Sequence, residues 1–150
     1  MQRIRFQLDQ ADWKGLEAES LWAKRIKRGQ YVLKNSPFYA YGVSAEDTVA
    51  ARSVERTLVF DRILKRGGHS TFRILLPEGG SIKSRKFLKF WRRLEGLGCT
   101  FELASKHWLA VDVPPCARID QVRLLLEKGE EASAWKFEEG HCGHKLDPQD

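Results

Sequence analysis

Residues 71–113 read TFRILLPEGGSIKSRKFLKFWRRLEGLGCTFELASKHWLAVDV and carry the strongest structural signals in the chain. The run from Thr71 to Leu76 is typical of a buried strand, and Pro77 with the glycines after it ends the strand. Ser81 has the right chemistry for the N-cap of a helix. Apolar side chains then recur at helical spacing, and Gly98 predicts the end of that helix.

The segments that follow extend this pattern. Thr100 to Ala104 and Trp108 to Val113 predict the two strands of a hairpin. Apolar residues from Ile119 to Leu126 lie at helical spacing, with Gly129 as the expected stop. Ala134 to Glu138 alternates as a half-exposed strand does. The order β-α-β-β-α-β is the ferredoxin-like pattern, in which both helices cover one face of a four-stranded antiparallel sheet.

The first half of the chain predicts a β-rich subdomain. Its strands are expected at residues 3–8, 19–26, 30–33, 48–52 and 57–64. Short strands with tight turns suggest a small, curled, barrel-like sheet. We therefore predict an α+β protein that is divided at the turn signal Arg66-Gly67-Gly68-His69. The predicted parts are a β-rich subdomain at 1–68, a ferredoxin-like subdomain at 69–140 and a flexible tail at 141–150.

The composition excludes several classes of protein. The chain has 150 residues, 42% hydrophobic and 31% charged, which suffices for a core and argues against disorder. The N-terminus lacks the apolar segment of a secretory signal, and no apolar run reaches the ~20 residues of a membrane helix. Cys99, Cys116 and Cys142 follow no metal-binding spacing and are expected to be reduced thiols. A cytoplasmic protein without contact to membranes is predicted.

Charge is unevenly distributed along the chain. The formal net charge is +6, and residues 127–150 hold seven acids and three bases, so the first 126 residues carry +10. A basic body suggests an anionic partner, although solubility alone also accounts for a charged surface.

The densest group of basic residues falls on the first predicted helix. No acid occurs between Ile82 and Leu94. At 100° per residue, the basic side chains within the helix cover about a third of its circumference, opposite the apolar side. The group consists of Lys83, Arg85, Lys86, Lys89, Arg92 and Arg93. It is either a surface for phosphates or an acidic protein, or a solvated helix face.

A second basic run precedes it in the sequence. It consists of Lys24, Arg25, Lys27, Arg28 and Lys34, and Tyr31, Phe38, Tyr39 and Tyr41 lie close by. Cations mixed with aromatic residues are typical of surfaces that bind single-stranded nucleic acid. The alternative is that the aromatic rings belong to the core while the cations protect a strand edge.

Two groups contain residue types that are found in catalytic or metal sites. His69-Ser70 with Asp61 or Asp112 offers the groups of a hydrolase triad, but neither a nucleophile elbow nor a glycine-rich oxyanion loop accompanies them. His141-Cys142-Gly143-His144 offers metal ligands without a second ligand pair at zinc spacing. We expect a structural role for the first group and a frayed tail for the second.

Other enzymatic signatures are missing from the sequence. Glu17 with Glu19 and Glu138 with Glu139 are expected to be surface carboxylates and not an acid–base couple. No phosphate loop, dinucleotide-binding glycine pattern or zinc-protease motif is present. We therefore predict no catalytic residue, no cofactor, no metal and no small-molecule ligand.

Five blocks of sequence stand out along the chain. They are Glu19-Ser20-Leu21-Trp22-Ala23; Pro37-Phe38-Tyr39-Ala40 with Gly42-Val43-Ser44 and Asp47; Gly68-His69-Ser70-Thr71; Val111-Asp112-Val113-Pro114; and Trp135-Lys136-Phe137-Glu138-Glu139. These blocks, in this order, resemble a bacterial family known only as domain of unknown function 4265. The resemblance covers nearly the whole chain. It implies a small cytoplasmic bacterial protein and brings no activity, cofactor or catalytic residue. The basic helix and the residues from Gly140 to His144 are not part of the family's motifs.

The function that these observations favour is non-catalytic binding of a macromolecule. A protein partner is the first expectation, for example a toxin that the chain neutralises as an immunity protein, or an enzyme that it regulates. The alternative is binding of RNA or DNA through the two basic groups. The chain is not expected to be an enzyme, because no convergent set of titratable residues is visible.

Overall fold

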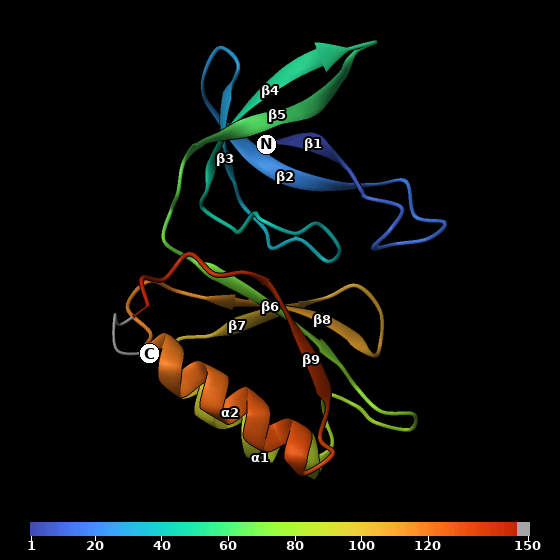
Figure 1. The fold of residues 1–150 in the computed structure, drawn as a ribbon, viewed down its shortest axis with the longest axis vertical. Coiled ribbons are helices and arrows are strands. Elements are labelled where there is room, and N and C mark those ends of the chain that lie inside the picture. Colours follow the sequence, from blue (N-terminus) through green and yellow to red (C-terminus); the bar gives the residue numbers. More distant parts are fainter. Residues whose placement is uncertain (147–150) are drawn as a thin grey trace.

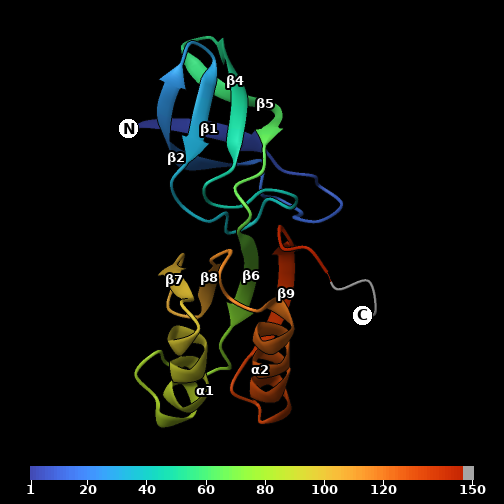
Figure 2. The same cartoon turned by 90° about the vertical axis from the view of Figure 1, so that its left-hand side faces the viewer.

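The structure is a computed structural model, and it describes residues 1–146 (Figure 1). Its elements are β1 (Gln2–Gln7), β2 (Ala18–Lys27), β3 (Gln30–Leu33), β4 (Thr48–Val54), β5 (Thr57–Lys65), β6 (Ser70–Leu75), α1 (Arg85–Gly96), β7 (Thr100–Leu103), β8 (Trp108–Val113), α2 (Ile119–Glu131) and β9 (Lys136–His141). Strands β1 to β5 form sheet A at one end of the molecule, and β6 to β9 form sheet B in the middle (Figures 1 and 2). The two helices lie on the side of sheet B that faces away from sheet A. The predicted mixture of strands and helices is confirmed.

Sheet A pairs its strands in chain order, β1-β2-β3-β4-β5. These pairings are antiparallel, and the order closes on itself because β1 also pairs in parallel with β5, where Ile4 lies opposite Leu58. The register shifts once between β2 and β3 and twice between β4 and β5. Such bulges bend a strand and increase its twist, which lets a short sheet curl around its own core. That core includes Ile4, Leu21, Leu33 and Val49, all fully buried.

Sheet B has the order β7-β8-β6-β9, and all neighbours are antiparallel. Strand β6 is central and buried from Ser70 to Ile74. Alternate side chains of a strand point to opposite faces, so Phe72 and Ile74 face the helices while Thr71 and Arg73 face sheet A. The helices bury their apolar sides on the first of these faces (Figure 1). The second face is covered by the first half of the chain.

The helices begin and end for reasons that the sequence reveals only in part. The N-cap of α1 is Ser84 and not the predicted Ser81, because the Oγ of Ser84 accepts a hydrogen bond from the Phe87 amide at 3.3 Å. Gly98 follows the end of α1 with φ +98°, as the sequence predicted. Gly129 was expected to follow the second helix but lies inside it. A glycine is needed at this position because a Cβ would come within 2.3 Å of the Trp135 ring.

The last strand also differs from the prediction. It was expected at residues 134–138 and is found at Lys136–His141. Ala134 and Trp135 precede it and are buried in the core under the helices. His141 therefore belongs to a strand, and residues 142–144 make the contacts that are given below, whereas the sequence predicted a flexible tail at 141–150. Residues 147–150 of that tail lie outside the described residues.

A loop between β3 and β4, residues 34–47, lies between the two sheets (Figure 1). We call it the junction loop. The Ser44 hydroxyl is 2.7 Å from that of Thr71 on β6, and the Ser36 amide donates to a Glu102 carboxylate oxygen on β7 at 2.9 Å. The loop therefore bonds to two strands of sheet B, while its ends continue the strands of sheet A.

The chain crosses from sheet A to sheet B at Gly67 and Gly68. A Cβ at Gly67 would lie 2.3 Å from the Glu46 carbonyl oxygen, and Gly68 has φ +87°. Only glycine satisfies both requirements, which explains the turn signal that the sequence shows at this point. In the part of the chain that the structure describes, no helix is both long enough and apolar enough to cross a membrane.

The packing of α1 leads to a first test. Trp91 is 3% exposed, stacks on Phe87 and meets Phe101 edge-on. We expect Trp91→Ala to lower the free energy of unfolding by about 3–5 kcal/mol, because it removes a large buried side chain. Urea denaturation measures the free energy of unfolding. The control is Arg92→Ala at the exposed neighbouring position, which should change that free energy by about 0.5 kcal/mol or less. An unchanged stability of Trp91→Ala would contradict the orientation of α1.

Cysteine chemistry gives a second test of the same core. Cys99 is 2% exposed, and burial raises the pKa of its thiol to about 12. The thiolate is the reactive form, so native Cys99 should resist alkylation by iodoacetamide near pH 8 while exposed Cys116 reacts readily. Mass spectrometry of the alkylated protein, with and without denaturant, measures both residues. Fast labelling of Cys99 in the folded protein would show that the core around it opens.

Candidate functional site

The six predicted basic residues at α1 are all exposed. Five of them, Arg85, Lys86, Lys89, Arg92 and Arg93, lie on the helix opposite its buried residues, and Lys83 precedes the N-cap. We call the five the basic face. Within residues 1–146, none of them forms an ion pair with a carboxylate. The structure therefore gathers these cations on one surface and leaves their charge uncompensated.

The basic face favours the end of the helix, where Arg93 lies in the last turn, but not its beginning or its middle. Arg85 and Lys86 lie in the first turn, which has no acidic residue, so they face the positive end of the helix dipole. Lys89 lies four residues from both Arg85 and Arg93, and like charges at this spacing each cost about 0.2–0.5 kcal/mol. A helix selected for stability alone would carry carboxylates at some of these positions.

The second predicted basic group is not brought together as one surface with the aromatic residues. Lys24, Arg25, Lys27 and Arg28 are exposed along the end of β2 and its turn into β3. Lys34 lies in the junction loop and pairs with Glu46 at 3.0 Å. The aromatic neighbours lie elsewhere: Tyr31 is core of sheet A, and Phe38, Tyr39 and Tyr41 belong to the junction loop. The cations lie on β2, its turn and the junction loop, whereas the rings lie in the core of sheet A or in the junction loop.

The histidine and serine groups form two separate pairs. His69 Nδ1 is 2.9 Å from a carboxylate oxygen of Asp112, whose pKa is raised by burial, an effect that the contact with His69 opposes. Asp61 is exposed and pairs with Arg62 instead. Ser70 is fully buried and does not bond to His69, so no triad is assembled.

The Ser70 hydroxyl instead bonds to Gly143 and His144, which follow β9. His144 Nε2 lies 2.9 Å from the Pro114 carbonyl, which can only accept, so this nitrogen carries the proton and Nδ1 is free to accept. Ser70 Oγ donates to that Nδ1 at 2.6 Å and accepts from the amide of Gly143 at 2.9 Å. This serine and histidine therefore have a structural role.

The possible metal ligands of the chain end are also not assembled. No group of three or more histidine, cysteine or acidic side chains within residues 1–146 is placed to hold a metal ion. Cys142 makes a weak contact from its sulfur to the His144 carbonyl, and His141 Nε2 is buried without a hydrogen-bond partner among these residues. Burial lowers the pKa of His141, with a smaller contribution from Arg66.

The most highly connected polar group is Arg73, which is fully buried in the middle of β6. Its guanidinium donates to Glu138 on β9 at 3.0 Å and to the carbonyls of Ala40 at 2.8 Å and Tyr39 at 3.2 Å. Its carbon lies 4.6 Å from the centre of the Tyr41 ring. Burial and the hydrogen bond to Glu138 raise the pKa of that tyrosine. Arg73 thus joins sheet B to the junction loop.

Glu19 on β2 holds the same loop from the other side. Its carboxylate is buried and accepts hydrogen bonds from the amides of Phe38, Tyr39 and Ala40. The prediction of a surface carboxylate at position 19 is therefore wrong. Glu138, which was also predicted to lie at the surface, is half-buried. The available signal was the resemblance itself, because its first two blocks contain Glu19 and the residues 37–40 that it binds.

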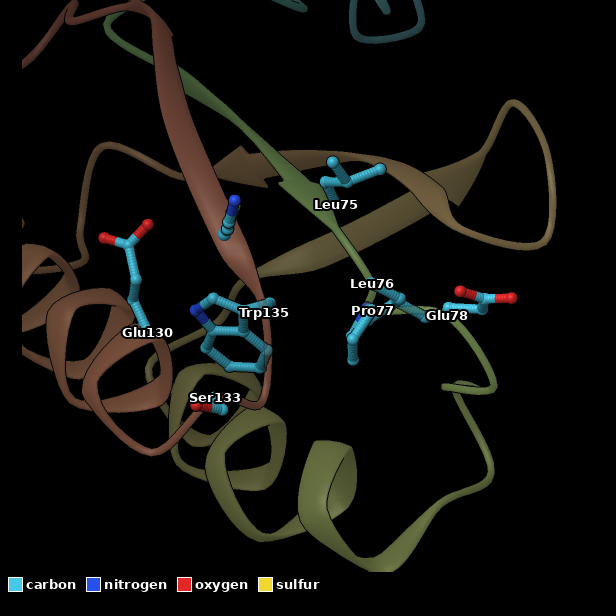
Figure 3. Close-up of a pocket in the computed structure, with 8 residues that line it drawn as sticks. Leu75, Leu76, Pro77, Glu78, Glu130, Ser133 and Trp135 are labelled. Atoms are coloured by element: carbon cyan, nitrogen blue, oxygen red, sulfur yellow. The ribbon is translucent and has the colours of Figure 1, made fainter.

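Two clefts lie at sheet B, and one of them borders the junction loop. The larger one has a volume of about 440 Å³ and is lined by Leu75, Leu76, Pro77 and Trp135, with Glu78 and Glu130 at its sides (Figure 3). The smaller one measures about 260 Å³, lies between the junction loop and sheet B, and contains the His69–Asp112 pair with Glu46 and Glu102. The lining of the first cleft also includes Ser133 and Lys136, and that of the second also includes Lys34, Ser36 and Thr100.

The fold and its surfaces define a class: a small α+β protein in which two sheets meet through a buried arginine. The chain matches the family described as Domain of unknown function (DUF4265) over residues 19–137. It belongs to that family, as the blocks of sequence indicated. A solved structure described as "Novel crystal structure of a hypothetical protein from Neisseria gonorrhoeae" is similar, with a TM-score of 0.79 and 19% identity over 96% of each chain. At this identity the likeness concerns the fold alone. None of the curated proteins matches the chain.

The role of Arg73 can be tested by substitution. We expect Arg73→Met to lower the free energy of unfolding by about 3–5 kcal/mol, because Glu138 and the loop carbonyls lose their donors in a buried place. Chemical denaturation measures the change. The comparison is Tyr41→Phe, which keeps the ring beside Arg73 and removes one hydrogen bond to Glu138, at a cost of about 1 kcal/mol. A stable Arg73→Met protein would show that the junction does not depend on this charge.

Proposed function

We propose that the protein is a non-catalytic binding protein that docks an acidic protein partner on the basic face of α1. The observation that carries this proposal is the set of five exposed cations without an ion-pair partner within residues 1–146. Two of them lie in the first turn, and Lys89 lies four residues from two other cations; because these placements disfavour the helix, a partner explains them better than folding does. A toxin neutralised by an immunity protein, or an enzyme under regulation, are the kinds of partner that fit.

We also infer the finer architecture that this surface belongs to. The order β7-β8-β6-β9, with antiparallel neighbours and both helices on one side, supports a ferredoxin-like assignment for residues 69–140. The closed order of sheet A supports a barrel-like assignment for residues 1–68. In this arrangement α1 lies in the outer layer of the molecule, where its exposed side is accessible to a large partner.

The architecture disfavours the alternative, which is nucleic-acid binding at the same place. Four-stranded sheets of this type bind RNA with aromatic residues on the open sheet face, and here that face contains buried Arg73 beneath the junction loop. The aromatic residues of α1, Phe87, Phe90 and Trp91, are buried and cannot stack on bases. The basic face therefore offers charge without a means of reading or stacking bases.

Charge reversal tests the proposal. Lys89→Glu with Arg92→Glu should abolish co-purification of a stoichiometric protein partner from nuclease-treated cells, because rim charges direct association. The fold should be preserved or slightly stabilised, since the glutamate introduced at position 89 lies four residues from Arg85 and Arg93. The matched control is Lys24→Glu with Lys27→Glu, which changes the same number of exposed cations on sheet A and should leave the partner bound.

The opposite result is equally clear. Nuclease-sensitive co-purification, with salt-dependent binding of a mixed-sequence oligonucleotide that the α1 reversal abolishes, would replace the protein partner by nucleic acid. Equal capture by wild type and both reversed variants would show that the basic face does not take part.

A further inference from the structure

The outer face of sheet A carries an exposed tryptophan. Trp22 lies on β2 with its neighbours Leu21 and Ala23 pointing into the core, and its side chain is 48% exposed. Its backbone is fixed, because its amide donates to Asn35 Oδ1 at 2.7 Å and its carbonyl accepts from the Lys34 amide at 2.8 Å. The indole is therefore held on a rigid strand without being needed to fill the core.

Cations surround this indole on the same face. Arg3 on β1 lies directly opposite Trp22, and its guanidinium carbon is 5.4 Å from the ring centre. Arg5 and Lys24 each lie two residues further along their strands, so both point to the same side as Arg3 and Trp22. All three cations are exposed, and within residues 1–146 none of them pairs with a carboxylate.

The nearest acids of these strands do not neutralise the face. Glu19 on β2 points inward and binds the junction loop. Asp61 on β5 is paired with Arg62. Ser20, which lies opposite Arg5, is neutral. The face therefore combines one exposed indole with three cations that form no ion pair within residues 1–146, and one of them, Arg3, lies over the indole ring.

We propose that this face binds single-stranded nucleic acid, with a base stacked on Trp22 and phosphates contacted by Arg3, Arg5 and Lys24. Stacking is tolerant of sequence because every base has a flat face, and a row of cations follows the backbone. In a duplex the base faces are stacked on one another, so they are not accessible to the indole. The site lies on sheet A, whereas the proposed protein-binding face lies on α1, beyond sheet B, so the two do not depend on each other (Figure 1).

The test uses the full-length protein and a fluorescein-labelled oligo(dT) of about 15 nucleotides, a length within the range that single domains of this size cover. Fluorescence anisotropy over a range of salt concentrations gives affinity and its salt dependence. Trp22→Ala should weaken binding about tenfold with unchanged circular dichroism, and Trp22→Phe should recover part of the loss. Arg3→Ala and Lys24→Ala should each lower the slope of log affinity against log salt by about 0.7.

Matched controls separate the site from general effects. Leu103→Ala removes an apolar side chain that is 45% exposed on sheet B, and Lys106→Ala removes an exposed cation from the β7–β8 turn. Neither should change binding. The reversal at Lys89 and Arg92 should leave oligo(dT) binding intact, so a failed protein partner and a failed nucleic-acid site remain distinguishable.

Four results would overturn the proposal. They are no binding of oligo(dT) even at low salt, equal binding by Trp22→Ala, duplex DNA bound as tightly as the single strand, and Trp22-dependent binding to phosphatidylserine vesicles without binding to oligo(dT).

Discussion

The buried charge of Arg73 is the constraint on which the arrangement of the two sheets depends. A guanidinium without partners in the interior costs several kcal/mol, so its donors must be matched. Glu138 supplies one acceptor from within sheet B, and the carbonyls of the junction loop supply the others. Because Glu19 holds the amides of the same loop, the loop is bonded from both sheets, and another packing would leave both charges unmatched.

This contact also determines which surfaces remain open. Sheet B is covered by the helices on one face and by the junction loop on the other (Figure 2). The surfaces that remain open include the outward sides of both helices and the outer face of sheet A. Of these, α1 and sheet A carry the cations described above that form no ion pair with a carboxylate within residues 1–146.

Local patterns were enough to predict most of the fold. The order of the strands and helices followed from periodicity and from turns such as Gly67-Gly68, because these depend on neighbouring residues. Ser84, Gly129 and the contacts of His144 could not be predicted in this way, since each is explained by geometry or by a residue far along the chain. Charged residues are usually exposed, so Glu19 resembled a surface residue until its partners in the junction loop were visible.

The histidine pairs show why catalytic residue types do not by themselves make a catalytic site. A nucleophilic serine needs access to substrate and amides that stabilise the developing anion. Ser70 is fully buried, and the nearby amides of Gly143 and His144 donate to Ser70 itself, which leaves them unable to stabilise an anion. The Ser70 hydroxyl is therefore already engaged in hydrogen bonds with Gly143 and His144. The same bonds hold residues 143 and 144 beside the start of β6, which gives this serine and histidine a structural role.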